Sequence, residues 1–444
     1  MFERECCILI QFSHSDGSMN LQTKLSVLAD AAKYDASCAS SGSVKRNSVG
    51  RTGVGSTSGG MGICHSYAPD GRCISLLKIL LTNFCIYECS YCVNRASSSV
   101  KRARFSVDEV VNLTLDFYKR NYIEGLFLSS GIIQSSDYTM EQLVNVARTL
   151  RKVHDFRGYI HLKTIPDASP ELLQEAGLYA DRLSINIELP SKQALTLYAP
   201  EKNPATIHRS MGQLRHHIDE SKESRQQASK IISSTKRKPS KPSRFIYSPA
   251  GQSTQMIVGA DASSDSKILT LSNYLYGKYQ MRRVYYSAFS PIPDAAQMLP
   301  AKAPPLVREH RLYQADWLLR FYGFTVDEIS QPNDERAGML DLDIDPKLSW
   351  AIRNRDFFPV NINRAPKETL LRVPGIGAIG AKKVMQSRQF RRLRFGDLAK
   401  CGLSVKKVAP FIEAVDYRPD ARLLESEHLK THFVERSSPQ MALF

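Results

Sequence analysis

Three cysteines lie close together in the stretch Cys85-Ile-Tyr-Glu-Cys89-Ser-Tyr-Cys92. They follow an apolar run, residues 74–81, that we expect to form a buried strand. Thiolates are soft ligands, and three of them on one short loop suit an iron–sulfur cluster. Zinc sites usually pair two C-x2-C hooks or add histidines, and residues 93–102 contain no His. Because a four-iron cluster normally takes four cysteines, three leave one iron free to bind a substrate or cofactor.

Tyr91, directly before the last cysteine, completes a pattern that resembles the signature of radical S-adenosylmethionine (SAM) enzymes. In that superfamily the free iron binds SAM, and an electron from the cluster cleaves SAM to a 5′-deoxyadenosyl radical that abstracts hydrogen from a substrate. The resemblance therefore implies a [4Fe–4S] cluster on Cys85, Cys89 and Cys92, with SAM as second cofactor. It also implies an electron donor such as a flavodoxin or ferredoxin.

The elements that must position these cysteines alternate between apolar runs and helical patterns. We expect strands at 74–81, 125–129, 159–163, 182–187, 255–258 and 284–289, and helices at 107–122, 140–153, 170–176 and 266–279. This alternation predicts a parallel sheet with helices outside it. Six such units fit a partial TIM-like barrel, the fold of the radical SAM superfamily, with active groups at the C-terminal strand ends. The predicted fold class is α/β, with a small all-α domain after the barrel.

A second pattern lies between residues 365 and 412. A helical segment meets Pro374-Gly375-Ile376-Gly377, and another helix is expected over 378–388. This resembles the helix-hairpin-helix motif, in which glycines let the backbone approach a phosphate at a helix N-terminus. A looser copy has Cys401-Gly402-Leu403 as its turn. The residues expected to bind nucleic acid are Gly375, Gly377, Lys382, Lys383, Arg391 and Arg392. A helical hairpin used for protein contacts is the alternative.

The formal net charge of +16 is concentrated in two segments. Residues 361–412 hold twelve Lys and Arg against two acidic residues, and residues 222–244 hold eight against one. Local basicity of this kind indicates an anionic partner such as nucleic acid. The segment 221–244 is also rich in Ser and Pro, and we expect a disordered insertion there. An arm that contacts nucleic acid is the alternative.

The resemblance to radical SAM enzymes also implies cofactor contacts. The superfamily has a Gly-Gly-Glu-like turn after its second strand, and the matching Ser129-Ser130-Gly131 lacks the glutamate. Backbone or hydroxyl groups of this turn are therefore expected at the SAM amino group. The further contacts implied are Lys163 at the SAM carboxylate, Ser184, Asn186 and Glu188 at the ribose, and Gln252 to Gly259 at the adenine, with Gln252, Ser253 and Thr254 facing the site.

Cys38, Cys64 and Cys73 lie outside the cysteine motif. With His65 they would form an auxiliary cluster or metal site in one interpretation. Their wide and irregular spacing favours scattered free thiols instead.

Five segments are expected in the 444 residues. They are an N-terminal extension (1–72), the barrel (73–290) with its basic insertion, a helical connector (291–345), the hairpin domain (346–420) and a tail (421–444). No apolar stretch reaches the ~20 residues of a membrane span, and the acidic start does not resemble a signal peptide. We therefore expect a cytoplasmic protein with no membrane partner. Met19 is an alternative start, and residues 1–18 are assigned no function.

From Met19 onward the chain resembles a bacterial radical SAM family associated with DNA modification and repair. The resemblance implies an enzyme that binds DNA and alters a base or sugar by hydrogen abstraction. One alternative is an RNA-modifying radical SAM enzyme of the methylthio- or methyltransferase type. The other is a non-catalytic iron–sulfur protein that binds DNA and senses redox state. The sequence leaves open the nucleic-acid target and whether SAM is consumed or regenerated.

Overall fold

The computed structural model describes residues 19–32, 63–67, 73–235, 246–292, 298–331, 335–426 and 428–434. The chain divides into two compact units. The first contains the residues up to Asp261 together with Tyr276–Lys302, and the second contains Ala262–Leu275 and Ala303–Phe444. In the described part, no helix is both long and apolar enough to cross a membrane.

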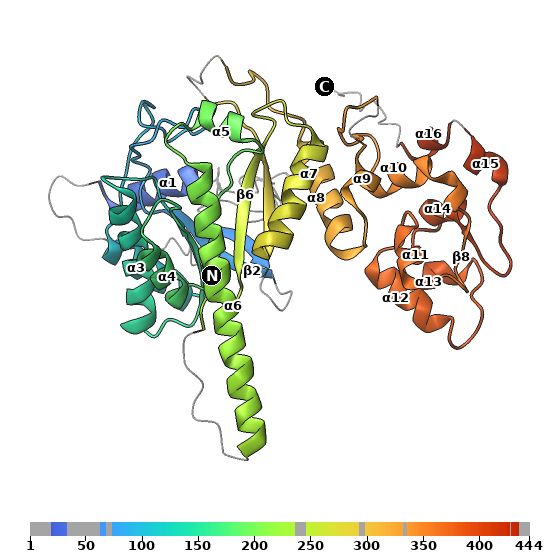
Figure 1. Cartoon of the computed structure of the whole chain (residues 1–444), viewed down its shortest axis with the longest axis horizontal. Coiled ribbons are helices and arrows are strands. Elements are labelled where there is room, and N and C mark those ends of the chain that lie inside the picture. The colour runs from blue at the N-terminus through green and yellow to red at the C-terminus, as the bar shows by residue number, and fades with distance from the viewer. Residues whose placement is uncertain are drawn as a thin grey trace, which may run out of the picture. The chain divides into compact units, whose positions relative to one another are not determined.

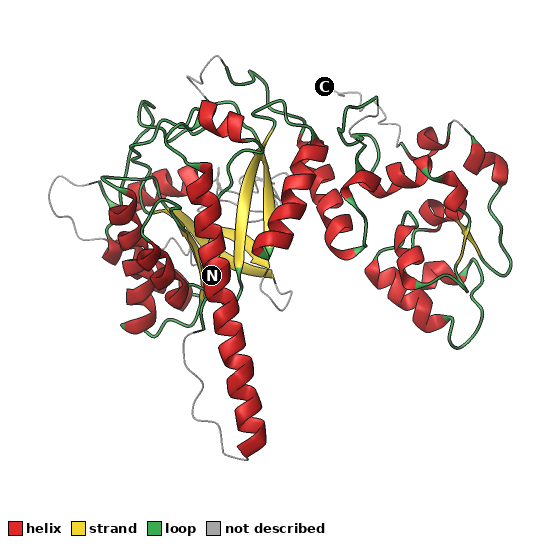
Figure 2. Cartoon of the chain, in the orientation of Figure 1, coloured by secondary structure: helices red, strands yellow, loops and turns green. Residues whose placement is uncertain are grey.

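The first unit is built on a seven-stranded sheet whose spatial order follows the order of the chain (Figure 1). Strands β2 to β7 run parallel, and β1 is antiparallel to β2. The strands are β1 (Ile63–Tyr67), β2 (Cys73–Leu80), β3 (Gly125–Ser129), β4 (Tyr159–Lys163), β5 (Arg182–Ser184), β6 (Gln252–Val258) and β7 (Arg283–Ala288). The sheet curls into part of a barrel, and helices cover its outer side (Figure 2). The predicted α/β partial barrel is confirmed.

Buried aliphatic side chains hold neighbouring strands in register. Leu77 pairs with Leu126, and Leu126 pairs with Ile160, and all three are fully buried. A strand buried on both faces tends to be largely apolar, as β3 is, and the sequence located both β3 and β4 to the residue.

Helices return the chain from the end of one strand to the start of the next. They include α2 (Val107–Lys119), α3 (Ser136–Lys152) and α4 (Pro170–Tyr179). The hydroxyl of Ser106 caps α2, and Glu109 completes a capping box. Ser135 caps α3 in the same way through the amide of Tyr138. Because each connection returns the chain to the same edge, the C-terminal ends of the parallel strands gather on one side.

Some elements differ from their prediction. Strand β5 ends at Ser184, three residues before its predicted end, and β6 begins at Gln252, three residues before its predicted start. Beyond β5 the chain contacts β6 through a hydrogen bond from the amide of Ile185 to the carbonyl of Ser253 at 3.2 Å and through an isolated bridge between Glu188 and Met256. The helix expected within the N-terminal segment, from the apolar spacing of Leu21, Leu25 and Leu28, is α1 (Leu21–Ala31), whereas β1 and α5 (Lys192–Tyr198) were not predicted.

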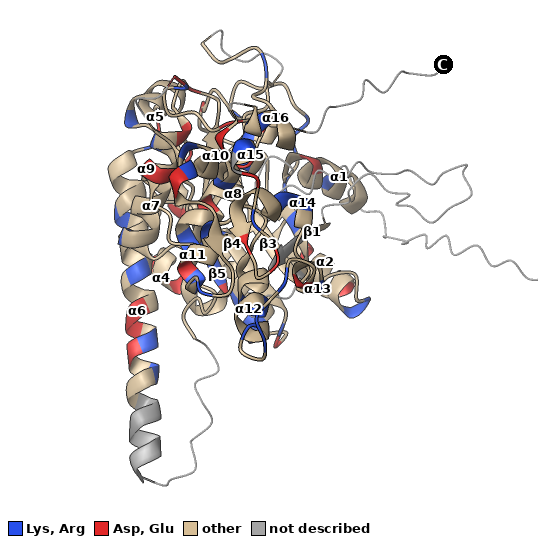
Figure 3. Ribbon diagram, turned by 90° about the vertical axis from the view of Figure 1, so that its right-hand side faces the viewer, with Lys and Arg blue, Asp and Glu red and all other residues tan. Residues whose placement is uncertain are grey.

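The basic insertion is largely helical where it is described. Helix α6 spans Pro204–Thr235, so the prediction of disorder from residue 221 is wrong up to residue 235. Residues 236–245 lie outside the described part. Asp219 contacts Arg215 at 3.1 Å and Lys222 at 3.0 Å, and such pairs one turn apart favour a helix. The far end of α6 extends past the neighbouring helices (Figure 1), and acidic and basic residues alternate along it (Figure 3).

The second unit is mainly helical. Its helices are α8 (Leu306–Phe321), α9 (Val326–Ile329), α10 (Pro346–Arg353), α11 (Lys367–Arg372), α12 (Ala378–Ser387), α13 (Asp397–Lys400), α14 (Val405–Val408), α15 (Ala421–Glu425) and α16 (Leu429–Phe433), and α7 (Asp265–Tyr279) contains residues of both units. A short parallel pair, β8 (Val360–Asn361) and β9 (Ile412–Glu413), joins segments fifty residues apart. The rings of Phe358 and Phe411 pack edge-on beneath it at 4.9 Å.

Candidate active site

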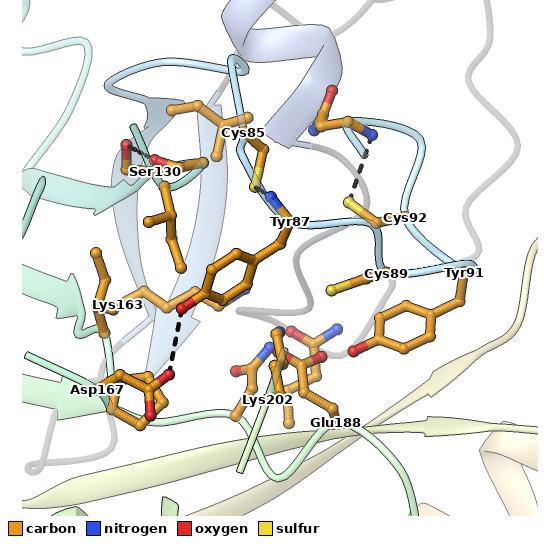
Figure 4. Close-up of a pocket in the computed structure, with 18 of the residues that line it drawn as sticks. Cys85, Tyr87, Cys89, Tyr91, Cys92, Ser130, Lys163, Asp167, Glu188 and Lys202 are labelled. Atoms are coloured by element: carbon orange, nitrogen blue, oxygen red, sulfur yellow. Dashed lines mark hydrogen bonds and ion pairs between the residues drawn. The ribbon is translucent and has the colours of Figure 1, made fainter. Parts of the chain in front are cut away.

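One pocket of the first unit lies where the parallel strands end (Figure 4). The loops after β2, β3, β4 and β5 contribute most of its walls, and β6 contributes Gln255 and Ile257. Nine of the predicted site residues line this pocket: Cys85, Cys89, Cys92, Tyr91, Ser130, Gly131, Lys163, Asn186 and Glu188.

Backbone hydrogen bonds fix the cysteine loop to its surroundings. The amide of Ile86 donates to the carbonyl of Ile132 at 2.8 Å, in the loop after β3. The amide of Ser90 donates to the carbonyl of Tyr198 at 2.7 Å, at the end of α5. The loop is therefore held from two sides without using the cysteine side chains.

Two backbone amides point at cysteine sulfurs. The amide of Tyr87 lies 3.5 Å from the Sγ of Cys85, and the amide of Asn94 lies 3.4 Å from the Sγ of Cys92. Hydrogen bonds to ligand sulfurs are one means by which proteins set the potential of an iron–sulfur cluster.

Arg102 binds the far end of the loop. Its guanidinium donates to the carbonyls of Asn94 at 2.9 Å, Arg95 at 2.6 Å and Ser98 at 3.0 Å, and also to that of Asn83. The planar fork of an arginine can satisfy several carbonyls at once, which the single ammonium of a lysine cannot do in the same geometry. Arg102 is thus a positioning residue for the cysteine loop.

Gly131 allows two loops to touch through their backbones. A Cβ at this position would lie 2.2 Å from the carbonyl oxygen of Phe84. The amide of Gly131 also donates to the carbonyl of Thr82 at 2.8 Å. Any side chain here would push the cysteine loop away from β3, so the glycine has a structural reason besides the cofactor contact expected of it.

Glu188 forms a buried ion pair with Lys202. The Nζ of Lys202 lies 2.5 Å from the Oε1 of Glu188, and their side chains are 19% and 10% exposed. Glu188 has a φ of +66°, and its amide donates to the carbonyl of Gln255 at 3.2 Å. The hydroxyl of Thr254 accepts from the amide of Ile187 at 2.9 Å. Strand β6 therefore holds Glu188 in a backbone conformation that L-residues rarely adopt.

Two tyrosines of the cysteine motif also line the pocket. The hydroxyl of Tyr87 lies 3.5 Å from the Oδ2 of Asp167. The Nζ of Lys202 lies 6.0 Å from the centre of the Tyr91 ring. Within the described residues, the hydroxyl of Tyr91 is buried and has no hydrogen-bond partner. A buried hydroxyl at a pocket wall is a group that a bound ligand would satisfy.

Burial and charge set the titration of this site. Burial raises the pKa of the Cys89 thiol to about 12, against the opposing effect of Lys202, and burial also raises the pKa of Cys92. Burial alone would lower the pKa of Lys202, but the Glu188 carboxylate holds that pKa well above its ordinary value. Buried thiols beside a fixed positive charge become thiolates when a metal replaces their protons.

The donor set matches an iron–sulfur cluster. Three free cysteines line one pocket, and two of their sulfurs accept backbone amides. Among the described residues, no three His, Cys, Asp or Glu side chains converge on a single metal ion. Ligands that each bind a different iron of a cluster do not need to converge. Cys85, Cys89 and Cys92 would hold the cluster.

Six of the expected contact residues lie outside the pocket lining: Gln252, Ser253 and Thr254 at the start of β6, and Ser129, Ser184 and Gly259. The Nε2 of Gln252 donates to the carbonyls of Met211 at 3.1 Å and Tyr279 at 2.8 Å. Gln252 begins β6, so it lies at the end of the strand away from the cysteines, and the pocket instead receives Gln255 and Ile257. The expectation that Gln252 faces the site is therefore wrong. Its cause is the late predicted start of β6.

The other three residues lie beside the pocket. Ser129 ends β3, and its carbonyl accepts from the amide of Leu81 at 2.7 Å. The hydroxyl of Ser184 is hydrogen-bonded to the Nε2 of His161 at 3.1 Å within the buried interior. Gly259 follows β6 with a φ of +83° and turns the chain there. None of these side chains lines the pocket.

The lining residues that were missed from the sequence include Tyr87, Asp167, Lys202 and Gln255. Tyr87 could have been predicted to line the pocket, because it lies inside the cysteine motif, two residues after Cys85. Lys202 lies between α5 and α6, which were not predicted, so nothing in the sequence placed it near the cysteines.

The auxiliary-site residues are only partly described. Cys64 lies in β1 and packs, partly buried, against the cluster of Ile74, Leu76 and Phe127. Free cysteines commonly pack in this way as small apolar residues. Cys38 lies outside the described residues.

The second unit contains a distinct candidate surface. Gly375 and Gly402 have φ angles of +84° and +78°, and each forms the turn of a helical hairpin. A Cβ on Gly375 would lie 3.0 Å from atoms of Lys407 and Val408, so the two hairpins pack tightly together. The predicted basic residues Lys382, Lys383, Arg391 and Arg392 are all exposed. Figure 3 shows basic residues on and around α12.

The backbone of Gly377 is not open to a phosphate in the way that the sequence led us to expect. Its φ is −94°, and a Cβ there would lie 3.1 Å from the hydroxyl oxygen of Tyr322. That oxygen accepts from the amide of Ala378 at 3.2 Å. A phenol oxygen thus already occupies an acceptor position at the start of α12.

Residues 79–235 match the model of the Radical SAM superfamily. No curated protein matches the chain. Among solved structures, the chain is similar to the FeFe-hydrogenase maturase HydG from Carboxydothermus hydrogenoformans (15% identity, 54% of this chain, 49% of that chain, TM-score 0.39). It is also similar to methylornithine synthase (11% identity, 55% of this chain, 61% of that chain, TM-score 0.38). A third similar structure is coproporphyrinogen III oxidase from Escherichia coli (13% identity, 61% of this chain, 56% of that chain, TM-score 0.32). The chain spans about half the length of the first of these structures.

Residues 79–235 therefore form a radical SAM domain, and the members of that superfamily are enzymes. The chain carries the domain of that superfamily, whose members use a [4Fe–4S] cluster and SAM. A purely redox-sensing protein without catalysis, one of the alternatives, does not agree with this assignment.

Proposed function

We propose that this enzyme binds nucleic acid, specifically duplex DNA, and modifies or repairs a base or sugar by hydrogen abstraction. The observation that carries the proposal is the pair of tightly packed hairpins, turned by Gly375 and Gly402 and lined by exposed basic side chains. This arrangement supports the resemblance to paired helix-hairpin-helix motifs, in which each hairpin contacts one strand of a duplex. Contacts of this type position a protein on DNA and carry little sequence information.

The first hairpin supplies three kinds of phosphate contact. The N-terminus of α12 presents backbone amides and the positive end of the helix dipole. Lys382 and Lys383 follow in the next turn and are exposed. The hydroxyl of Tyr322 accepts from Ala378, which leaves its own proton for a phosphate oxygen.

The pocket supplies the chemistry. When bound, the cluster and SAM provide a 5′-deoxyadenosyl radical that can attack unactivated C–H bonds of a base or sugar. The ion pair of Lys202 and Glu188 places one positive and one negative group on the wall near the cysteines. Lys163 and Asn186 offer further polar groups. The pocket also has apolar lining residues, among them Ile132, Ile165 and Ile257, which suit a flat, apolar ring.

Binding is tested by fluorescence anisotropy with labelled DNA and RNA duplexes at several salt concentrations. The variant Lys382→Ala/Lys383→Ala should reduce the slope of log affinity against log salt by up to about 0.9 per lost phosphate contact. The charge-matched control is Lys119→Ala/Arg120→Ala, which removes two exposed cations at the end of α2. An equal loss in both variants, or no binding to any duplex, would contradict the proposal. Tighter binding to RNA would favour the RNA-modifying alternative.

The reaction is tested by nucleoside analysis. Digested DNA and RNA from cells with and without the gene are compared by mass spectrometry, and we expect the changed nucleoside in DNA. A change confined to RNA would move the substrate to the alternative class.

A further inference from the structure

Phe390 is one of the most exposed apolar residues in the described part of the chain. Its side chain is 88% exposed, although it lies close to the end of the well-packed helix α12. Exposing a large aromatic ring to water is unfavourable, and a partner that covers the ring removes this cost. Single exposed apolar residues are nevertheless common on protein surfaces, so exposure by itself does not indicate a partner. The surroundings of Phe390 therefore decide what it could bind.

Phe390 borders a hollow of about 330 Å³ between the two hairpins. Three cations lie around the same hollow: Lys383, Arg391 and Lys400. All three residues are exposed, and Lys383 Nζ lies 3.6 Å from where a Cβ of Gly402 would be. The hollow thus has an aromatic ring and three cations at its border. Two of these cations contact the carboxylate of Asp397, Arg391 at 2.6 Å and Lys400 at 3.8 Å, and the hollow adjoins the turn of the second hairpin.

The inner wall of the hollow is polar and fixed. Asp397, which is 8% exposed, accepts from the Nη2 of Arg391 at 2.6 Å and from the amide of Arg394 at 3.0 Å. Ser387 and Cys401 contribute a hydroxyl and a thiol that lie 3.9 Å apart. Short hydrogen-bonding groups on a closed wall suit the edge of a flat heterocycle.

We infer that this hollow receives a nucleobase that has left its stack, with Phe390 as the stacking surface. The inference rests on the proposed function, because it requires nucleic acid on the second unit. An aromatic face binds any base, the cations bind the flanking phosphates, and the polar wall meets the base edge. The second unit would then favour DNA with an unpaired nucleotide over an intact duplex, which neither hairpin explains by itself.

The test compares four labelled DNAs by anisotropy at one salt concentration. They are a paired duplex, the same duplex with one bulged thymidine, the same bulge with an abasic residue, and a single strand. We expect the full-length protein to bind the bulged thymidine more tightly than either the paired or the abasic duplex. Phe390→Ala should reduce affinity for the bulged thymidine about five- to hundredfold, as loss of one stacked base does, and should leave the paired duplex unchanged.

Two further variants separate stacking from general apolar contact. Phe390→Trp should keep the preference for the bulge, because it preserves an aromatic face. Phe390→Leu should lose it, although it keeps most of the apolar surface. Equal affinity of the wild-type protein for all duplexes would overturn the inference, as would a Leu variant that behaves like the wild type. Absence of binding to every DNA would instead contradict the proposed function, so the two failures are distinguishable.

Discussion

The ammonium of Lys202 lies 2.5 Å from the carboxylate of Glu188, although the two residues stand on opposite sides of α5 in the sequence. Both side chains are largely buried, and Glu188 is the principal charge acting on Lys202. The pair places a compensated charge beside three cysteines that must become thiolates. This relationship was not predicted from the sequence, and it is the first to test.

Removing one partner should leave a buried charge without compensation. Lys202→Met should lower the free energy of unfolding of the metal-free protein by about 3–5 kcal/mol, and Glu188→Gln should also destabilise it. The double variant should lose less free energy of unfolding than the two single variants lose together, and the difference, the coupling energy, should be about 1–3 kcal/mol. Chemical denaturation measures these values. The exposed pair Lys222 and Asp219 is the control, with an expected coupling below about 1 kcal/mol.

The cysteine assignment predicts a defined iron content. Anaerobically reconstituted protein should lose about four irons per chain when Cys85, Cys89 and Cys92 are replaced by Ala. The variant Cys64→Ala should retain its iron, because Cys64 packs in β1 as an apolar residue. Iron and sulfide assays with absorption spectra give the readout. Full iron in the triple variant would show that another site holds the cluster.

The carbonyl contacts of Arg102 predict a less stable cysteine loop when they are removed. Arg102→Lys cannot satisfy the carbonyls of Asn94, Arg95 and Ser98 together. Each lost charge-assisted bond costs about 1.5–3 kcal/mol, so iron release to a chelator should become at least several-fold faster. Arg104→Lys is the matched control, since Arg104 is exposed and donates to the hydroxyl of Tyr138 instead. Equal release rates in the two variants would remove the role assigned to Arg102.

A buried lysine predicts a pH dependence of stability in the second unit. Burial lowers the pKa of Lys347 to about 8, against the opposing effect of Asp345, and its Nζ donates to the carbonyls of Leu371 and Ile376. Between about pH 8 and the ordinary lysine value, the unfolded chain binds a proton here that the folded chain has lost. The free energy of unfolding should therefore rise with pH in this window, by up to about 1.36 kcal/mol per unit.

The measurement compares denaturation of the wild type with that of Lys347→Met from pH 7 to 10. The difference between the two proteins should be constant below about pH 8 and should then change in favour of the wild type. A difference that stays flat to pH 10 would mean that the two carbonyls keep Lys347 charged in the folded protein.

Local patterns in the sequence were sufficient for the sheet and for the cysteine motif. Strand β3 is a largely apolar run, β4 has the apolar residues Ile160 and Leu162 on either side of His161, and the spacing of the three cysteines is itself the chemical signal. The same holds for the hairpin at Gly375, whose positive φ agrees with a glycine turn.

Contacts between distant segments were not accessible from the sequence. Lys202 reaches the site through an unpredicted loop, and Tyr322 reaches Ala378 from a helix 56 residues earlier. The placement of Gln252 failed because the polar residues Gln252 to Thr254 were not recognised as the first residues of β6, which lie at the end of the strand away from the cysteines. The length of α6 was missed because its exposed half lacks an apolar face.

The close contact between Gly131 and Phe84 also bears on the order in which the chain can acquire its metal. The bonds that shape the cysteine loop connect Thr82 to Gly131 and Ile86 to Ile132, and Arg102 completes them. These contacts come from the first third of the chain, whereas the bonds of the Ser90 amide to Tyr198 and of the Glu88 amide to Glu201 come from later residues. During synthesis much of the cysteine loop can therefore fold before Glu188 and Lys202 have left the ribosome. Binding of iron and completion of the cofactor pocket are then separate steps.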